Sequence, residues 1–307
     1  MVRGSRDGHQ DANVRPALDY RFARDQRRVY SHTQALPVII RSMSISPSIS
    51  ACVICNNGAP LIRRCLDSLA WCEDIVVVDS GSTDGTPDIA RNHLPGKVRV
   101  IRHDWPGFNP QRQFAVSQCR HEWVLMLDMD EECSDELRQE IFALAEAQLD
   151  GRALFRMPRK NFIARRYVRC WSPDYQTRFV HRDRVEWDPR SLPEIRKAKE
   201  SFSEGAFRGS ILHNRLSPYR PTDFNEGVRQ ALYAEELAEN MKKRGKRAGW
   251  LNLLFRPSMT FLKYYVLRGS FLDGRFGLVV AYKTTIGVML KYSVLYGKEL
   301  QDVNDEQ

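Results

Sequence analysis

The sequence predicts an α/β fold with a mainly parallel sheet flanked by helices, followed by amphipathic helices. From Ile49 to Leu127, short apolar segments alternate with helical patterns, which is typical of parallel strands joined by helices. The segment DIVVVD at 74–79 is apolar throughout its middle, as expected of a strand buried on both faces. Ligands of such sheets bind outside the carboxyl ends of the strands. The loops that follow Cys55, Asp79 and Leu127 should therefore share one crevice.

The spacing of apolar residues predicts the individual strands and helices. The segment at 61–69 carries apolar residues at helical intervals, and KVRVIRH at 97–103 alternates as a strand does. The loop SGSTDGT after Asp79 is rich in small residues and leads into a helix with Pro87 in its first turn. We expect strands over 49–55, 74–79, 97–103 and 123–127, and helices over 61–69, 87–92, 109–119 and 222–246.

The stretch WVLMLDMDEE at 123–132 is a short apolar strand that ends abruptly in acid. Asp128 and Asp130 are two residues apart, so both can turn toward one cation where the chain leaves the strand. Clustered oxygen ligands suit Mg²⁺ or Mn²⁺ that is also held by a substrate's phosphates. The alternative is an acidic strand end that caps a helix beginning near Ser134.

Composition narrows the class of partner and the compartment. The 307 residues include 47 Lys and Arg against 38 Asp and Glu, a net charge of +9 that favours nucleic acid, anionic lipid or a phosphorylated substrate. Among the seven cysteines, Cys52 and Cys55 have metal-ligand spacing, but in a strand they face opposite sides. Reduced thiols, and the lack of a signal-like apolar run after the charged start, predict a cytoplasmic protein.

Three regions are expected: an Arg-rich flexible arm (1–45), a catalytic domain (46–245, with a nucleotide half at 46–135 and an acceptor half at 136–245), and a basic amphipathic helical region (246–307). Residues 242–298 hold twelve Lys and Arg and one Asp. The apolar run 276–296 contains Lys283 and Lys291, each costing about 2.5–3.5 kcal/mol at a bilayer centre. We expect helices lying on an anionic membrane surface. A helical subdomain packed on the sheet is the alternative.

Four blocks in this order, VICNNGAPLIRRCLDSL, DIVVVDSGSTDGT, GFNPQRQFA and WVLMLDMDEE, resemble the family 2 glycosyltransferases with the GT-A fold. The later segments WSPDYQTRF and RGSFLDGRFG extend the likeness to about residue 300. More narrowly, the chain is similar to bacterial lipopolysaccharide core enzymes that add β-glucose to inner-core heptose. This resemblance implies a divalent metal and a UDP-sugar donor.

The resemblance gives roles to residues of the nucleotide half. Asp79 would accept a hydrogen bond from uracil, and the alternative is a helix or turn cap with Ser82. Asp84 would lie in the same site, but an Asp before Gly is a routine turn residue. Three more residues would contact the donor: Arg112 at the nucleotide or its phosphates, Asp128 near the ribose, and Asp130 as the metal ligand. For Arg112, a solvated surface position is an equally open alternative.

Two positions depart from the family pattern. Cys55 and Asn57 replace an aromatic residue and a carboxylate that usually follow the first strand, which puts the strength and identity of nucleotide binding in question. Pro193 replaces the histidine of a His-Glu pair, and Glu194 remains.

Inverting transfer to a hydroxyl needs a general base on the acceptor side. We predict Glu194 for this role, with Asp174 as the rival. Aromatic rings stack on sugar faces and Arg binds phosphate or carboxylate as a fork, so an acceptor wall is expected at Trp171, Tyr175 and Arg178. Ordinary core and rim positions are an equally open alternative for them. His181 and His213 have no partner at metal-ligand spacing and are interpreted as structural.

The resulting hypothesis is an inverting glycosyltransferase that moves glucose from UDP-glucose onto a lipid-linked saccharide, the lipopolysaccharide inner core, at the inner face of the inner membrane. An acceptor that is polyprenyl phosphate, or a capsule or exopolysaccharide sugar, stays open. Charge alone would also fit a nucleic-acid-binding protein. No nucleic-acid motif is present, however, and the bases are interleaved with apolar residues, which suits lipid better.

Overall fold

The computed structural model describes residues 48–305, except 145, 164, 188–195 and 216–223. These residues belong to one compact unit, Ile45–Gln307. The predicted arm over 1–45 and the predicted base Glu194 lie outside the described residues.

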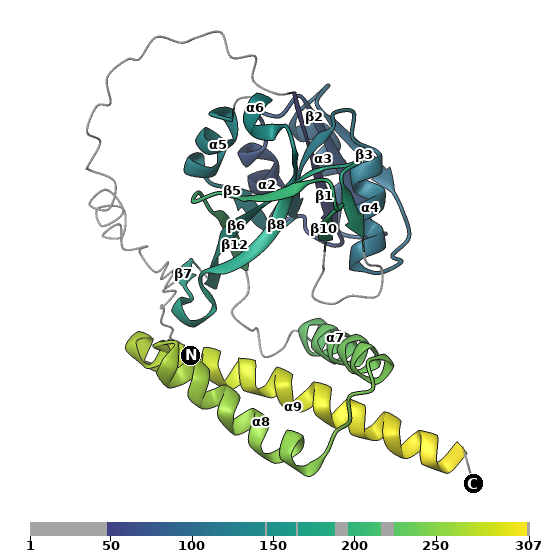
Figure 1. Ribbon diagram of the computed structural model, residues 1–307, viewed down its shortest axis with the longest axis vertical. Helices are drawn as coiled ribbons and strands as arrows, with labels where there is room; N and C mark the ends of the chain where they lie inside the picture. The colour runs from purple at the N-terminus through teal and green to yellow at the C-terminus, as the bar shows by residue number, and fades with distance from the viewer. Residues whose placement is uncertain (1–47, 145, 164, 188–195, 216–223, 306–307) are drawn as a thin grey trace, which may run out of the picture. The chain divides into compact units, whose positions relative to one another are not determined.

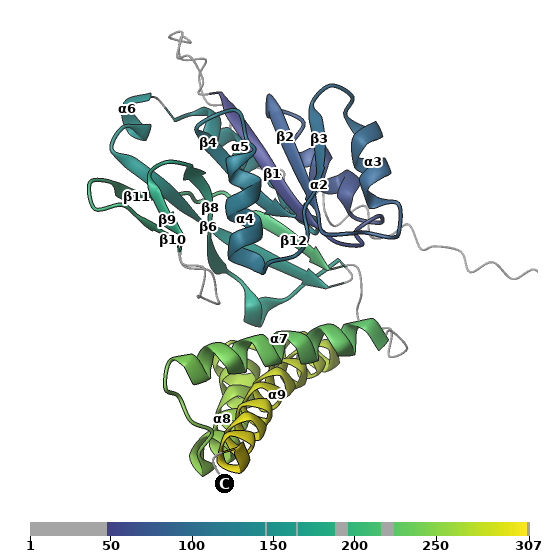
Figure 2. The ribbon, with the colours of Figure 1, turned by 90° about the vertical axis from the view of Figure 1, so that its right-hand side faces the viewer.

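The first four strands form the parallel half of the main sheet, in the order β3-β2-β1-β4 (Figure 1; β4 is labelled in Figure 2). Every one of them was predicted from apolar patterning, to within one residue at each end. Their order follows from right-handed crossovers through the intervening helices. Their bounds are β1 Ile49–Cys55, β2 Asp74–Asp79, β3 Val98–Arg102 and β4 Trp123–Asp128.

Helices cover both faces of these strands (Figure 2). Ala51 and Val53 of β1 pack with residues of α2, α3 and α5, whereas Cys52 packs with residues of α4 on the opposite face. The predicted separation of Cys52 from Cys55 across the strand is confirmed, and all seven cysteines are free and buried. Ser134 caps α5 by accepting a hydrogen bond from the Leu137 N–H. The helices are α2 Ile62–Ser68, α3 Thr86–His93, α4 Phe108–Ser117 and α5 Asp135–Phe142.

The second half of the sheet is mixed. β8 joins antiparallel to β4, and the order continues β8-β6-β12-β5. The expectation of a mainly parallel sheet is confirmed, and each antiparallel pair of this sheet includes a strand of the acceptor half. The bounds are β5 Glu131–Cys133, β6 Arg152–Ile163, β7 Arg166–Tyr167, β8 Asp174–His181, β9 Val185–Trp187, β10 Arg196–Ala198, β11 Ser203–Ala206 and β12 Ile211–Arg215, with α6 at Glu146–Leu149 and the 3₁₀ turn η2 at Arg169–Trp171.

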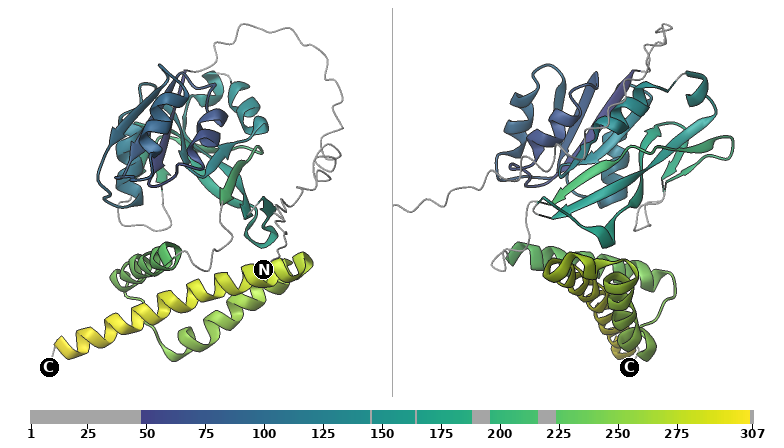
Figure 3. Two further views of the ribbon diagram at one scale, coloured as in Figure 1. Left: turned by 180° about the vertical axis from the view of Figure 1, so that it is seen from behind. Right: turned by 90° about the vertical axis from the view of Figure 1, so that its left-hand side faces the viewer.

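The C-terminal region is helical, as predicted. Figure 3 shows α8 running alongside the long helix α9, and the Phe261 and Tyr282 rings meet between them at 5.1 Å. In the described part of the chain, one stretch, Ser270–Asp302, is long and apolar enough to cross a membrane by length and composition. The elements are α7 Phe224–Lys243, α8 Trp250–Leu262, the π-helical turn η3 Lys263–Leu267, the 3₁₀ turn η4 Ser270–Asp273 and α9 Gly274–Asp305.

Candidate active site

Strand register brings the predicted nucleotide residues to one edge of the sheet. Cys55 is paired with Asp79, and Asp79 with Arg102, so these three residues end β1, β2 and β3 side by side. Asp128 ends β4 opposite Ile54 of β1. This edge is where ligands of parallel sheets bind.

Asp79 organises the loop that follows β2. Its buried carboxylate, 4% exposed, accepts hydrogen bonds from the Gly81 N–H at 3.1 Å and the Ser82 N–H at 3.0 Å, and also from the Ser82 hydroxyl. The Cys55 thiol donates to the same carboxylate at 3.6 Å, and burial, followed by the charge of Asp79, raises the pKa of that thiol. The turn-cap role is therefore present in the fold, whatever the carboxylate does toward a ligand.

A hollow of about 370 Å³ lies beside this loop, within the size range of small-molecule sites. Its lining includes Asp79, Ser82, Arg91 and Arg102. Arg102 was not among the predicted site residues. Its position as the last residue of the third strand, level with Asp79, was the available signal.

The first two loops are tied together by the other predicted nucleotide residues. Asn57, at a positive φ of 54°, accepts a hydrogen bond from the Thr83 N–H at 2.9 Å. Asp84 accepts from the Ala59 N–H at 2.9 Å and the Thr86 N–H at 3.0 Å. Partial burial opposes ionisation of Asp84, but its hydrogen bonds from Thr86 and Ala59 prevail and lower its pKa. In this conformation Asn57 and Asp84 shape the loops.

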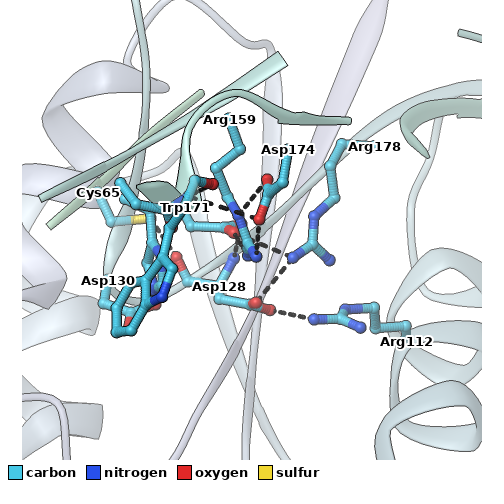
Figure 4. Close-up of polar contacts among 11 residues, drawn as sticks. Cys65, Arg112, Asp128, Asp130, Arg159, Trp171, Asp174 and Arg178 are labelled. Carbon is cyan, nitrogen blue, oxygen red and sulfur yellow. Dashed lines mark hydrogen bonds and ion pairs between the residues drawn. The ribbon is translucent and has the colours of Figure 1, made fainter. Parts of the chain in front are cut away.

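Asp128 is clamped between two buried arginines (Figure 4). Nη2 of Arg112 donates to one of its oxygens at 2.5 Å, and Nη2 of Arg178 to the other at 2.8 Å. Burial alone would raise the pKa of Asp128, but the two guanidinium charges hold it well below its usual range. Burial, together with the charge of Arg178, lowers the pKa of Arg112. Asp128 is thus a fixed anion at the end of β4.

A second ion-pair network adjoins it. Glu131 is fully buried and accepts from Arg178 at 3.1 Å, from Arg159 at 2.8 Å and from the Asp128 N–H at 3.0 Å. Arg159 also binds Asp174 through two hydrogen bonds, of 3.1 and 2.9 Å. Burial opposes the charge on Arg159, but Glu131 and Asp174 prevail and raise its pKa. Both oxygens of Asp174 are thus occupied by the Arg159 guanidinium, which disfavours Asp174 as the general base.

Asp130 lies against His213, which the sequence had suggested was structural. Their Oδ2 and Nε2 atoms are 3.1 Å apart, and Nδ1 of His213 is 2.7 Å from Oδ1 of Asn161. The Asn161 amide donates to the Trp171 carbonyl at 3.0 Å, so its oxygen faces His213 and Nδ1 must carry a proton. With the proton on Nδ1, the lone pair of Nε2 faces the Asp130 carboxylate, an arrangement that a cation bound between them would stabilise. The two residues therefore fit a cation site with a fixed tautomer, although no cluster of three or more metal-ligating side chains occurs within the described residues.

The three residues of the predicted acceptor wall lie in different environments. Tyr175 is 66% exposed, whereas Arg178 is 2% exposed and occupied with Asp128 and Glu131, so its direct role is in positioning. The indole N–H of Trp171 donates to the Thr284 hydroxyl at 2.9 Å, which joins the acceptor half to α9. Glu194 lies in the undescribed segment 188–195, so its position relative to the other site residues stays a prediction.

Comparison with known proteins identifies the domain. A model described as glycosyl transferase family 2 matches residues 50–195. This chain carries a family 2 glycosyltransferase domain. The match begins at β1 and includes Asp79, Asp128 and Asp130, which the expected resemblance had selected.

Curated proteins and solved structures are similar to this glycosyltransferase over most of its length. A lipopolysaccharide core biosynthesis glycosyltransferase, LpsC, from Rhizobium meliloti is 27% identical over 256 residues, 81% of this chain and 92% of that protein. An uncharacterised glycosyltransferase from Rickettsia conorii is 28% identical over 268 residues, covering 85% and 94%. Among solved structures, the mannosyltransferase PcManGT from Pyrobaculum calidifontis, in complex with GDP-Man and Mn²⁺, gives a TM-score of 0.47 at 14% identity, covering 93% and 94%.

Proposed function

We propose that this glycosyltransferase transfers a sugar, glucose from UDP-glucose, with inversion onto a lipid-linked saccharide of the lipopolysaccharide inner core. The observation that carries the proposal is the meeting of Asp79, Asp128 and Asp130 at one sheet edge, with His213 against Asp130. The core acceptor is supported by the similarity to LpsC, whose name assigns it to lipopolysaccharide core biosynthesis. Such an acceptor would place the enzyme at the inner face of the inner membrane.

The two ends of this sheet edge would contact different parts of the donor. Asp79 and Arg102 line the hollow and would offer an acceptor and a cation to the nucleoside. Asp128, held by its two arginines, would contact the ribose. Because Cys55 and Asn57 replace an aromatic residue and a carboxylate, base recognition would depend more heavily on Asp79 and its neighbours.

Asp130 and His213 would hold the divalent metal. One carboxylate and one imidazole leave most coordination positions to water and to the two phosphates of the donor, which suits Mg²⁺ or Mn²⁺. When bound, such an ion neutralises the charge that develops on the leaving diphosphate. The protein's own part is to fix Asp130 and the tautomer of His213 through Asn161.

The acceptor hydroxyl needs a base on the side of the sugar away from the diphosphate. Glu194 is our candidate, because Asp174 is engaged with Arg159. Glu194 stands where the family's His-Glu pair has its glutamate, although Pro193 replaces the histidine. A positioned base contributes about 10²- to 10⁴-fold.

A thermal-shift panel of nucleotide sugars, with and without Mn²⁺, tests the donor and the metal together. A ligand at 100 times its Kd should stabilise the fold by about 2.7 kcal/mol. We expect UDP-glucose with Mn²⁺ to raise the melting temperature most, and Asp130→Asn to remove the Mn²⁺-dependent part. Equal shifts with every nucleotide sugar, or no shift with any, would contradict the proposal. Release of UDP on adding core saccharide, but not polyprenyl phosphate, would then support the acceptor.

A further inference from the structure

The two C-terminal helices turn apolar side chains toward solvent. In the described residues, sixteen of the twenty large apolar side chains with high exposure belong to 250–300. Trp250 at 87% and Leu267 at 78% are the most exposed of them. Exposed apolar patches beyond the usual extent on a soluble protein mark an interaction surface.

The exposed side chains form two rows at helical spacing. On α8 the row recurs at intervals of three and four residues, and on α9 the same periodicity continues for six turns. Phe261, at the margin of the first row, contacts Tyr282 of the second, so the two rows adjoin. We call this surface the apolar face, and its residues are Leu251, Leu254, Phe255, Met259, Leu262 and Val266 of α8 and η3, with Val279, Tyr282, Ile286, Met289, Tyr296 and Leu300 of α9.

A cluster of bases accompanies the apolar face. The guanidinium of Arg256 lies 6.0 Å from the centre of the Tyr292 ring, and Nζ of Lys291 lies 5.4 Å from it. Burial, followed by the charges of Arg256 and Lys246, lowers the pKa of Lys291, as expected of a base with other bases nearby. Among the residues that the structure describes, no carboxylate forms an ion pair with any of these three bases. Three neighbouring cations with no counter-charge are suited to phosphate groups.

We propose that the apolar face and the basic cluster Lys246, Arg256 and Lys291 form a docking surface for an anionic phospholipid bilayer, with α8 and α9 lying in the membrane interface. The large apolar side chains would enter the boundary between headgroups and acyl chains, and the bases would bind lipid phosphates. This deepens the proposed function by naming the surface that meets the membrane.

The charge of this surface disfavours three other arrangements: a second copy of the chain on the face, the segment 1–42 on the face, and a membrane crossed by Ser270–Asp302. A second copy placed on the same face would add three more bases, and no residue that defines the apolar face is a carboxylate that could oppose them. The segment 1–42, with eight arginines and four aspartates, is itself positive and does not complement the cluster. A spanning orientation of Ser270–Asp302 would bring Lys283 and Lys291 into the hydrocarbon, which is costly. An anionic surface satisfies the bases and the apolar rows together.

The docking surface is coupled to the acceptor half of the site. Trp171 donates to Thr284 of α9, and Nζ of Lys283 lies 6.0 Å from the centre of the Trp171 ring. Val280 packs with Ile163 and Val168, and Val168 directly precedes η2, the 3₁₀ turn that contains Trp171. A bilayer bound to α8 and α9 would thus have a direct structural connection to the residues predicted to meet a lipid-linked acceptor.

Flotation of the full chain with vesicles tests the surface without any transfer reaction. We expect binding to phosphatidylcholine vesicles with 30% phosphatidylglycerol, weak binding to pure phosphatidylcholine, and release as NaCl rises from 0.1 to 0.5 M. Arg256→Gln with Lys291→Gln should weaken binding by about 25-fold, since each base near an anionic surface contributes roughly fivefold. Arg138→Gln with Lys199→Gln removes the same charge from the catalytic domain and should have a much smaller effect.

A second pair of variants tests the apolar rows. Leu254→Ser with Phe255→Ser should abolish flotation, whereas Phe142→Ser, an exposed apolar residue of α5, should leave it unchanged. The proposal is overturned if binding to neutral vesicles is equally tight and resists 0.5 M NaCl, if the charge variant binds like the parent, or if the parent is a lipid-free dimer that Leu254→Ser with Phe255→Ser converts to monomers. Nucleotide-dependent thermal shifts, measured on the same samples, report separately on the proposed donor site.

Discussion

Nε2 of His213 lies 3.1 Å from Oδ2 of Asp130, although 83 residues separate them in the chain. The contact arises because β12 pairs antiparallel with β5, which places His213 opposite Glu131. Asn161 of β6 then holds the far side of the imidazole. Three strands thus converge on the acidic tip that the sequence had marked as the metal site.

Asp130→Asn should abolish transfer and Mn²⁺-dependent nucleotide binding, because the site loses an anionic ligand at nearly constant volume. The melting temperature without ligand should stay close to that of the parent. Isothermal titration of UDP with and without Mn²⁺ measures the effect. Unchanged turnover in the purified variant would remove the metal role of Asp130.

His213→Gln should raise the Mn²⁺ concentration needed for half-maximal activity by at least about tenfold, since it removes the imidazole but keeps a polar side chain. Asn161→Ala, which frees the imidazole, should cost about 10- to 100-fold in metal affinity, the range found when the partner that orients a metal ligand is removed. His121→Gln, in the loop before β4, is the matched control. A metal requirement unaffected by His213→Gln would make the histidine a structural partner only.

Asp79→Ala should reduce discrimination between UDP- and GDP-sugars. Because Asp79 also caps its loop, the variant needs a companion that disturbs the cap alone. Ser82→Ala removes the hydroxyl that donates to Asp79 and keeps the carboxylate. Competition binding of UDP and GDP to both variants separates the roles. If the two variants lose affinity equally and Asp79→Ala retains its preference for uracil, Asp79 is a cap.

The parallel half of the fold was predictable and the ion-pair networks were not, for one physical reason. A strand buried on both faces can be recognised from a local apolar run, such as that at 74–79. A parallel sheet then places the carboxyl ends of these strands at one edge. Arg178 and Arg159 come from antiparallel strands whose order depends on tertiary packing rather than on local pattern. His213 likewise has no local spacing to Asp130. Arg178 therefore looked like an acceptor ligand in the sequence, although the fold buries it against Asp128.

Asp74 gives a stability prediction with a defined pH dependence. Burial opposes ionisation of the Asp74 carboxyl. Hydrogen bonds from the Arg120 N–H, Arg99 and Ser50 outweigh burial and lower the pKa of Asp74 below 3.8. A depressed folded-state pKa contributes stability above the unfolded value, and that contribution is lost as the pH falls through the folded value. Asp74→Asn should therefore lower the free energy of unfolding by about 1–3 kcal/mol at pH 7.

The difference between Asp74→Asn and the parent should shrink as the pH falls below about 3.8, where the unfolded-state carboxyl becomes protonated. Urea denaturation at pH 7 and pH 3 measures it. Asp88→Asn, which removes an exposed i,i+3 pair with Arg91, should change stability by less than about 0.5 kcal/mol at either pH. A difference that is constant with pH would show that the Asp74 network acts through packing rather than charge.

The identity of the general base, Glu194 or Asp174, can be tested through the contacts of Arg159. Glu194→Gln should lower kcat by at least about 100-fold with little change in donor affinity, the pattern expected of a group that acts in the transition state. Asp174→Asn should cost less, because the ionised Asp174 is already bound to Arg159. Arg159→Lys, which loosens that grip while keeping the charge, distinguishes positioning from catalysis. If Asp174 is the base, Arg159→Lys should shift the pH dependence of kcat and Asp174→Asn should be inactive. If Glu194 is the base, the pH profile should survive in Arg159→Lys and disappear only in Glu194→Gln.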